Sequence, residues 1–208
     1  MNFLIARPLI EDLIVIILFL GVISFHEFSH ALAAYLLGDD TAKRFGRLTL
    51  NPIAHIDVIG LLCLFFFRIG WARPVPVDIR NFRYPKFYGV LTGLAGPFSN
   101  LLLAIVLLYL IKIIPMIMTT QPDIIDLLKL GVQLNIMLFL FNLLPVPPLD
   151  GSHIIYALIP RAWEQYYFRF QQISLVLLLL ILVTPFFHIW FAHAIKVTYH
   201  LLQNLVLL

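Results

Sequence analysis

The sequence has few charged residues and a single cysteine. Aspartate, glutamate, lysine and arginine make up 12% of the 208 residues against 62% hydrophobic residues, and the mean hydropathy is +0.97. Soluble domains usually hold about 25% charged residues, so these values exclude an ordinary soluble domain. They predict a chain that crosses a membrane several times. The lone Cys63 excludes an internal disulfide.

A dense basic patch is also missing. The formal net charge is only +3, and the basic residues are scattered among aromatic residues. This distribution is typical of loops that face anionic lipid and argues against a nucleic-acid partner. No cleavable signal peptide, internal repeat or low-complexity linker is recognisable. We therefore expect one membrane domain over residues 1–208.

Four apolar stretches indicate membrane-spanning helices, and the apolar tail after them could either span or lie on the surface. The stretches cover residues 9–37, 88–115, 125–144 and 173–183, the last with an extension to 187. The predicted fold is an all-α polytopic membrane protein with about four to six transmembrane helices.

A shorter apolar stretch lies between the first two spans. Residues 58–67 are too few to cross a bilayer as a helix, and Pro74 and Pro76 favour an extended backbone after them. A short re-entrant or β-hairpin membrane segment fits this pattern. Its edge could hold an extended substrate by strand addition.

Basic residues are concentrated around that short segment. Residues 38–90 hold eight of the fourteen Lys and Arg residues against four Asp residues. Because cytoplasmic loops are enriched in Lys and Arg, we expect this segment in the cytoplasm and the N-terminus on the opposite side. The second half of span one and the end of span three then face the cytoplasm.

The first span carries ionisable residues where hydrocarbon should surround them. In His-Glu-Phe-Ser-His, His26 and His30 lie one helical turn apart and could share a zinc ion, while Glu27 could take a proton from a water molecule at the metal. Burying such groups in a membrane is costly, so they need partners. A chance match, or histidines bonded to nearby carbonyl groups, is the alternative at this point.

Asp150 is the candidate third zinc ligand. It follows the proline-rich stop of the third span at residues 145–148, on the same side of the membrane as the histidines. Two imidazoles and one carboxylate leave a position open for water, as hydrolytic zinc sites require. An ordinary turn aspartate before Gly151 is the alternative.

Together these motifs resemble those of the site-2 protease family of intramembrane zinc metalloproteases. They occur in the family's order and cover residues 26–30, 51–55 (Asn-Pro-Ile-Ala-His), 96–100 (Gly-Pro-Phe-Ser-Asn) and 141–151. The overall pattern is similar to that of the compact bacterial members without a PDZ or nucleotide-sensing domain.

The resemblance implies a specific activity and a role for each site residue. One zinc ion per chain would bind His26, His30 and Asp150, Glu27 would act as the general base, and Asn142 would contact the substrate backbone or the developing oxyanion. The implied reaction is peptide-bond hydrolysis in or near transmembrane segments of membrane proteins, that is, regulated intramembrane proteolysis. The expected location is the bacterial inner membrane, and the loop charge places the active site towards the cytoplasm.

Structural roles are expected for the remaining polar residues. His55 is more typical of a cap before the short membrane segment than of a partner of the metal site. Asn100 could face the site, but an Asn at this position more often bonds a neighbouring helix. Arg73 suits lipid phosphate better than substrate. His153 is left out because a fourth protein ligand would close the coordination. Poor spacing indicates interfacial positions for His188, His193 and His200.

Two other functions fit a membrane chain with these residues. A metal transporter should distribute histidines and acids along a path through the membrane, whereas here they gather at one depth. A catalytically silent scaffold is disfavoured because both Glu27 and Asp150 are present. The sequence leaves the substrate and the oligomeric state open.

Overall fold

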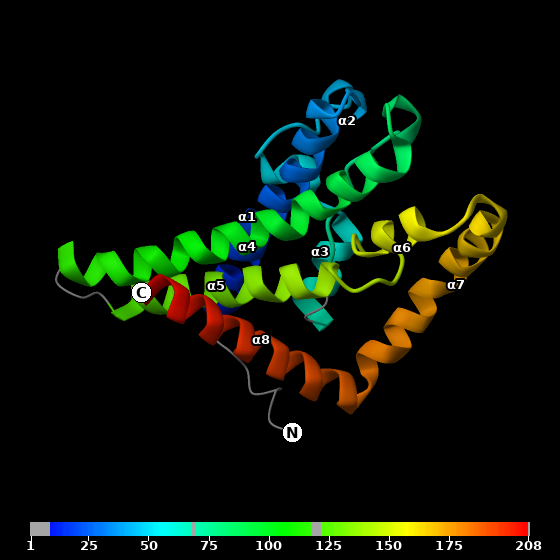
Figure 1. Cartoon of the computed structure of the whole chain (residues 1–208). Helices are drawn as coiled ribbons and strands as arrows, with labels where there is room; N and C mark the ends of the chain where they lie inside the picture. Colours follow the sequence, from blue (N-terminus) through cyan, green and yellow to red (C-terminus); the bar gives the residue numbers. More distant parts are fainter. Residues whose placement is uncertain (1–8, 68–69, 118–121, 208) are drawn as a thin grey trace.

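The computed structural model describes residues 9–67, 70–117 and 122–207, and helices joined by turns and extended segments make up this part of the chain (Figure 1). In chain order they are α1 (Leu9–Leu36), α2 (Thr41–Arg44), η1 (Pro52–His55), α3 (Val58–Phe67), η2 (Ile79–Asn81), α4 (Pro85–Ile117), α5 (Pro122–Asn142), α6 (Ser152–Leu158), η3 (Arg161–Trp163), α7 (Glu164–Val183) and α8 (Pro185–Leu207). The elements named η are short 3₁₀ helices.

The prediction of an all-α polytopic membrane protein is confirmed. Within the described residues, four segments are long and apolar enough to cross a membrane: Leu13–Leu36, Pro85–Ile114, Asp123–Asn142 and Arg161–Val183. The first three follow the predicted spans closely. The fourth begins about twelve residues earlier than predicted, because the aromatic connection before residue 173 is already helical from Glu164.

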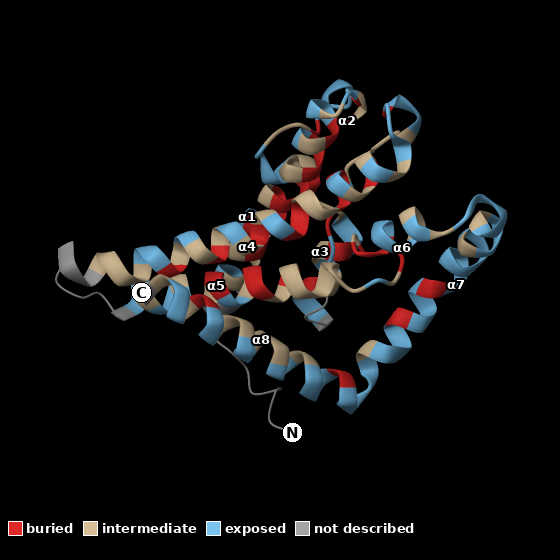
Figure 2. Ribbon diagram, in the orientation of Figure 1, coloured by how far each residue is buried: buried red, intermediate tan, exposed pale blue. Residues whose placement is uncertain are grey.

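Helices α4 and α5 run side by side, and α1 crosses them (Figure 1). The tail after α7, whose placement the sequence left open, is the helix α8, which packs on α4 and α5. Buried residues are concentrated on α1 and on the facing sides of α4 and α5 (Figure 2). One apolar cluster joins α4, α5 and α8 and contains Ala104, Leu108, Val132, Ile136 and Leu202.

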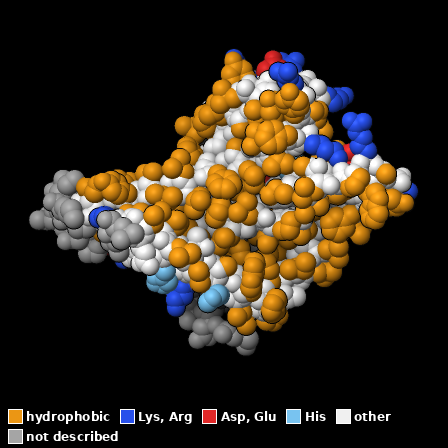
Figure 3. Space-filling model, viewed as in Figure 1, with side chains coloured by type: hydrophobic (Ala, Val, Ile, Leu, Met, Phe, Trp, Pro, Cys, Tyr) orange, Lys and Arg blue, Asp and Glu red, His pale blue; other side chains and the backbone are white. Residues whose placement is uncertain are grey.

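A second apolar cluster lies on the N-terminal side of His26. It contains Phe19, Val22, Ile23, Leu64, Ala72 and Leu138, and so brings α1, α3 and α5 together. Outside these clusters, hydrophobic side chains cover most of the face seen in Figure 3, as a lipid-facing surface requires.

The short segment after the first span is helical rather than a β-hairpin. Residues 58–67 are the helix α3, and the chain returns in an extended conformation through Pro74 and Pro76. One antiparallel bridge between Ile56 and Ala72, with an Arg73 N–H bond to the His55 carbonyl at 2.9 Å, replaces a hairpin ladder. The described residues contain no strand pairing longer than this single bridge, because each proline removes a backbone donor.

The turn after α1 anchors this returning segment. Gly38 ends the helix in the left-handed region with φ +106°, as the predicted stop requires. The fully buried Asp39 then accepts hydrogen bonds from the Thr41 and Asp78 N–H groups at 3.1 and 2.8 Å, and from the Asn81 amide at 2.7 Å. Asp39 therefore ties the end of α1 to the segment that leads into α4.

Candidate metal centre and active site

Three predicted ligands from distant parts of the chain converge at one point. His26 and His30 project from the same face of α1, and their Nε2 atoms lie 3.0 Å apart. Asp150 Oδ2 lies 3.2 Å from His26 Nε2 and 3.3 Å from His30 Nε2. Among the residues that the structure describes, these three form the one group of His, Cys, Asp and Glu side chains placed to share a metal ion.

Hydrogen bonds behind the two histidines fix which ring nitrogen is free. His30 Nδ1 lies 2.7 Å from the Thr92 carbonyl oxygen, which can only accept, so Nδ1 carries the proton. His26 Nδ1 lies 2.6 Å from Asn100 Oδ1, which is likewise an acceptor. Both Nε2 atoms therefore present lone pairs towards Asp150.

Three acceptor atoms facing one another need a cation between them. Asp150 Oδ2 is buried and has no hydrogen-bond donor among the described residues, and a buried acceptor without a donor is costly. Zinc bound tetrahedrally at about 2.0–2.1 Å keeps its donor atoms about 3.3–3.4 Å apart. The observed spacings of 3.0, 3.2 and 3.3 Å are equal to or slightly shorter than that value, so this donor set fits a zinc ion after a small outward shift of the side chains.

The wall opposite α1 also leaves room for an ion. A Cβ atom built on Gly96 of α4 would lie 2.3 Å from His30 Nε2 and 2.6 Å from His26 Nε2. Real Cβ atoms do not approach so closely, so any other residue at position 96 would enter the space between the ligands. The Gly-Pro-Phe-Ser-Asn motif thus supplies the site with both a gap at Gly96 and the amide of Asn100.

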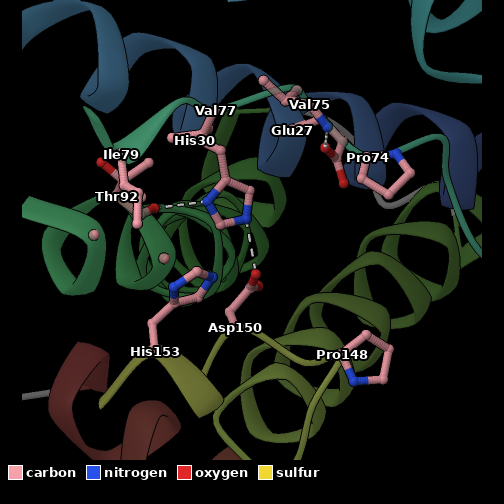
Figure 4. A pocket seen from close by; sticks show the side chains of 12 residues that line it. Glu27, His30, Pro74, Val75, Val77, Ile79, Thr92, Pro148, Asp150 and His153 are labelled. Carbon is pink, nitrogen blue, oxygen red and sulfur yellow. Dashed lines mark hydrogen bonds and ion pairs between the residues drawn. The ribbon is translucent and has the colours of Figure 1, made fainter. Parts of the chain in front are cut away.

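Glu27 lines a cavity that reaches two of the three predicted ligands, His30 and Asp150 (Figure 4). The cavity encloses about 280 Å³, and Glu27, His30 and Asp150 line it together with the extended segment from Pro74 to Val77. The Val75 N–H group donates to Glu27 Oε2 at 2.9 Å. This bond holds the carboxylate beside the ligands, where it can reach a water molecule in the cavity.

A buried arginine supports the same extended segment from behind. Arg47 donates through Nη2 to the Arg73 carbonyl, and the same nitrogen lies 3.3 Å from His55 Nδ1. His55 in turn donates through Nε2 to the Thr49 carbonyl at 2.8 Å. His55 therefore has the structural role that the sequence favoured, and it orders the segment that carries Val75.

Two predicted assignments gain detail from the structure. Asn100 does bond a neighbouring helix, through Asn135, but its Oδ1 also contacts His26, one of the predicted ligands. His153 is not in the ligand group, as expected, although it lines the cavity beside Gly93. Sequence reasoning missed the carbonyl of Thr92, because a backbone group leaves no trace in a motif.

Asn142 stands apart from the cavity lining. Its side-chain amide donates to the Leu138 carbonyl of its own helix at 3.1 Å, and its backbone carbonyl accepts from Gly151 N–H at 2.7 Å. The second bond places the loop that carries Asp150. A contact between Asn142 and substrate stays a prediction. The side chain of Arg73 and the rings of His188, His193 and His200 are exposed, outside the ligand group.

Comparison with known proteins places this chain in a family. The family model of Peptidase family M50 matches residues 110–185. A putative zinc metalloprotease, YwhC of Bacillus subtilis (strain 168), is 42% identical over 171 residues, which cover 79% of this chain and 78% of that relative.

More distant relatives bear a similar description. Putative zinc metalloprotease Rip2 of Mycobacterium tuberculosis (strain ATCC 25618 / H37Rv) is 30% identical over 80% of this chain and 65% of its own length. Rip2 of Mycolicibacterium smegmatis (strain ATCC 700084 / mc(2)155) is 29% identical over the same shares. No solved structure matches the chain. The motifs and the level of identity to YwhC lead to one conclusion: the chain belongs to Peptidase family M50, the site-2 proteases.

Proposed function

We propose that His26, His30 and Asp150 hold the zinc ion of this intramembrane metalloprotease and that Glu27 is its general base. The observation that carries the assignment is the convergence of three acceptor atoms within 3.0–3.3 Å of one another. Neither histidine can donate a hydrogen bond to Asp150, because each Nδ1–H group already bonds an acceptor on α4. A divalent cation can accept all three lone pairs at once.

Each site residue then has a defined task in peptide hydrolysis. When bound, zinc polarises the scissile carbonyl and makes a water molecule more acidic. Glu27 accepts the proton that water releases as its oxygen attacks the carbonyl carbon, and passes that proton to the leaving nitrogen as the C–N bond breaks. Val75 N–H orients the Glu27 carboxylate for both transfers.

The substrates that we propose are membrane proteins cleaved in or near their transmembrane segments. A helical substrate must unwind first, because its carbonyl groups are engaged in helical hydrogen bonds. The extended segment beside the cavity can accept such a strand but offers it no free donor between Arg73 and Pro76. Arg73 and Val75 already use their N–H groups, and Pro74 and Pro76 have none. Substrate N–H groups would therefore bond to carbonyl oxygens of this segment.

The orientation that we propose places the cavity on the cytoplasmic side of a bacterial inner membrane. Exposed basic residues lie around the end of the molecule that carries α2 (Figure 3), including Lys43, Arg44, Arg80 and Arg83. The positive-inside rule assigns such an end to the cytoplasm. Oligomeric state does not enter this assignment.

Glu27→Gln separates catalysis from metal binding. Purified protein should contain about one zinc per chain and cleave a membrane-embedded reporter substrate. In Glu27→Gln we expect cleavage to fall by a factor of about 10²–10⁴ with zinc content unchanged, because Glu27 is not a ligand.

Glu164→Gln makes the same chemical change at the start of α7, outside the cavity lining; it removes the charge that pairs with Lys86 and should keep activity. Normal cleavage by Glu27→Gln would show that the proposed mechanism is wrong. Zinc transport across the membrane of sealed vesicles without any cleavage would show that the chain is a transporter and not a protease.

A further inference from the structure

A chain of buried amide groups lies behind His26. Asn100 on α4 and Asn135 on α5 are both 0% exposed. His26 Nδ1 lies 2.6 Å from Asn100 Oδ1, Asn100 Nδ2 donates to Asn135 Oδ1 at 3.0 Å, and Asn135 Nδ2 donates to the Gly131 carbonyl at 2.8 Å. The chain of bonds therefore runs from a metal ligand on α1 through α4 into α5.

The far end of this chain sets the direction of every bond in it. The Gly131 carbonyl can only accept, so Asn135 must turn its Nδ2 towards it and its Oδ1 towards Asn100. Asn100 must then donate through Nδ2 and turn its own Oδ1 to His26. Because Asn100 Oδ1 is an acceptor, the imidazole of His26 must carry its proton on Nδ1.

That direction decides whether His26 can bind metal. With the proton on Nδ1, the Nε2 lone pair faces Asp150 and His30. If Asn100 were reversed, its Nδ2–H would face the imidazole and favour the tautomer with a proton on Nε2. A protonated Nε2 cannot be a ligand, so the orientation of one amide switches the site between competent and incompetent.

We propose that Asn135 is a positioning residue of the metal centre, which fixes through Asn100 the tautomer of His26 that binds zinc. The inference rests on the proposed role of His26 as a ligand. Asn135 lies in another helix, two side chains removed from the metal, and touches none of the reacting groups. Asn100 and Asn135 are both fully buried, so no water molecule can replace Asn135 as the hydrogen-bond partner of the Asn100 amide.

The test measures zinc affinity of the full chain in detergent by competition with a chromogenic zinc chelator. Asn135→Leu keeps a similar volume but removes the acceptor. We expect zinc to bind about tenfold more weakly, which is the smaller loss of affinity typical when a hydrogen-bond partner of a metal ligand is mutated. Asn135→Ser is the second variant, since its hydroxyl can bond the Gly131 carbonyl within the helix but does not reach Asn100. It should weaken zinc binding similarly.

A double-mutant cycle tests whether the effect passes through Asn100. Asn100→Leu alone should weaken zinc binding at least as much as Asn135→Leu, and the double variant should bind no more weakly than Asn100→Leu. Additive losses would contradict the inference. Val132→Ala creates a packing defect at an equally buried position of α5; it should lower the melting temperature and leave zinc affinity unchanged.

A spectroscopic measurement distinguishes positioning from loss of structure. Cobalt(II) loaded in place of zinc reports its ligand geometry in the visible absorption spectrum. We expect an altered spectrum for Asn135→Leu and Asn135→Ser and the wild-type spectrum for Val132→Ala.

The outcomes also separate this inference from the proposed function. If wild-type protein binds no zinc, or His26→Ala binds it normally, the ligand assignment fails. If zinc binding depends on His26 while both Asn135 variants keep wild-type affinity and spectrum, the ligand assignment stands and the inference about Asn135 is wrong.

Discussion

At the scale of single residues, Gly96 is the position of α4 that faces the Nε2 atoms of both histidines. Adding one methyl group there would place a carbon 2.3 Å from His30 Nε2. The backbone conformation of a helix suits alanine well, so the cost of Gly96→Ala arises from the collision alone. The position therefore allows metal binding to be tested without changing any ligand.

In Gly96→Ala we expect zinc content and cleavage both to be lost, with an overpacking penalty of about 1–3 kcal/mol in the free energy of unfolding. Zinc analysis of the purified variant and the reporter cleavage assay measure the first two. Gly21→Ala on α1 is the matched control, because its new Cβ would meet nothing within 4 Å. Full zinc content in Gly96→Ala would contradict the position assigned to the ion.

The convergence of the three proposed ligands was predictable from sequence, but the groups that orient them were only partly so. His26, Glu27 and His30 share a local helical motif, and Asp150 follows a proline-marked helix end. Asn135 carries no motif, because its role arises only from the packing of α4 against α5. Local patterns report which side chains share a face, and tertiary contacts decide what those side chains meet.

At the scale of elements, the link between α1 and the returning extended segment depends on one carboxylate. Burial by itself raises the pKa of Asp39, but hydrogen bonds from Thr41, Asn81 and Asp78 outweigh it and lower the pKa below its usual value. In Asp39→Asn the side chain can no longer accept all of these bonds. We expect a loss of about 1–3 kcal/mol in the free energy of unfolding.

The same group gives stability a defined pH dependence. The folded pKa of Asp39 is lower than the unfolded pKa, so its contribution is complete above about pH 4 and is lost as pH falls towards the folded pKa. Melting temperatures of wild type and Asp39→Asn should therefore converge in acid. Asp40→Asn removes only an exposed ion pair with Arg44 and should cost little at any pH. Parallel melting curves of wild type and Asp39→Asn down to pH 2 would count against the assignment.

Helix boundaries were predictable where the sequence marks them chemically. Gly38 ends α1, and the prolines from 145 onward follow the end of α5 within three residues. The start of α7 was missed because aromatic and charged residues before residue 173 suit an interface and a helix equally well. For residues 58–76 the sequence left two forms open; residues 58–67 form the helix α3, whose Leu64 packs against α1.

At the scale of the whole molecule, the proposed orientation predicts which ends face the cytoplasm. With Cys63 replaced by alanine, single cysteines are introduced as Lys43→Cys beside α2 and Asp123→Cys at the start of α5, both exposed positions. In intact spheroplasts a membrane-impermeant maleimide should label only Asp123→Cys. Lys43→Cys should react only after the membrane is permeabilised. The reverse pattern would place the metal centre on the opposite side.

The apolar cluster of Phe19, Val22, Ile23, Leu64, Ala72 and Leu138 has a consequence for the cell. Phe19 precedes His26 by about 10 Å along α1, so the cluster lies between the hydrated cavity and the far side of the bilayer. In the proposed orientation, water reaches the scissile bond from the cytoplasm, and this cluster keeps the protein apolar towards the opposite side. If the site lies as proposed, we expect a cell to hydrolyse peptides within its energised membrane without a proton leak that would drain the gradient across it.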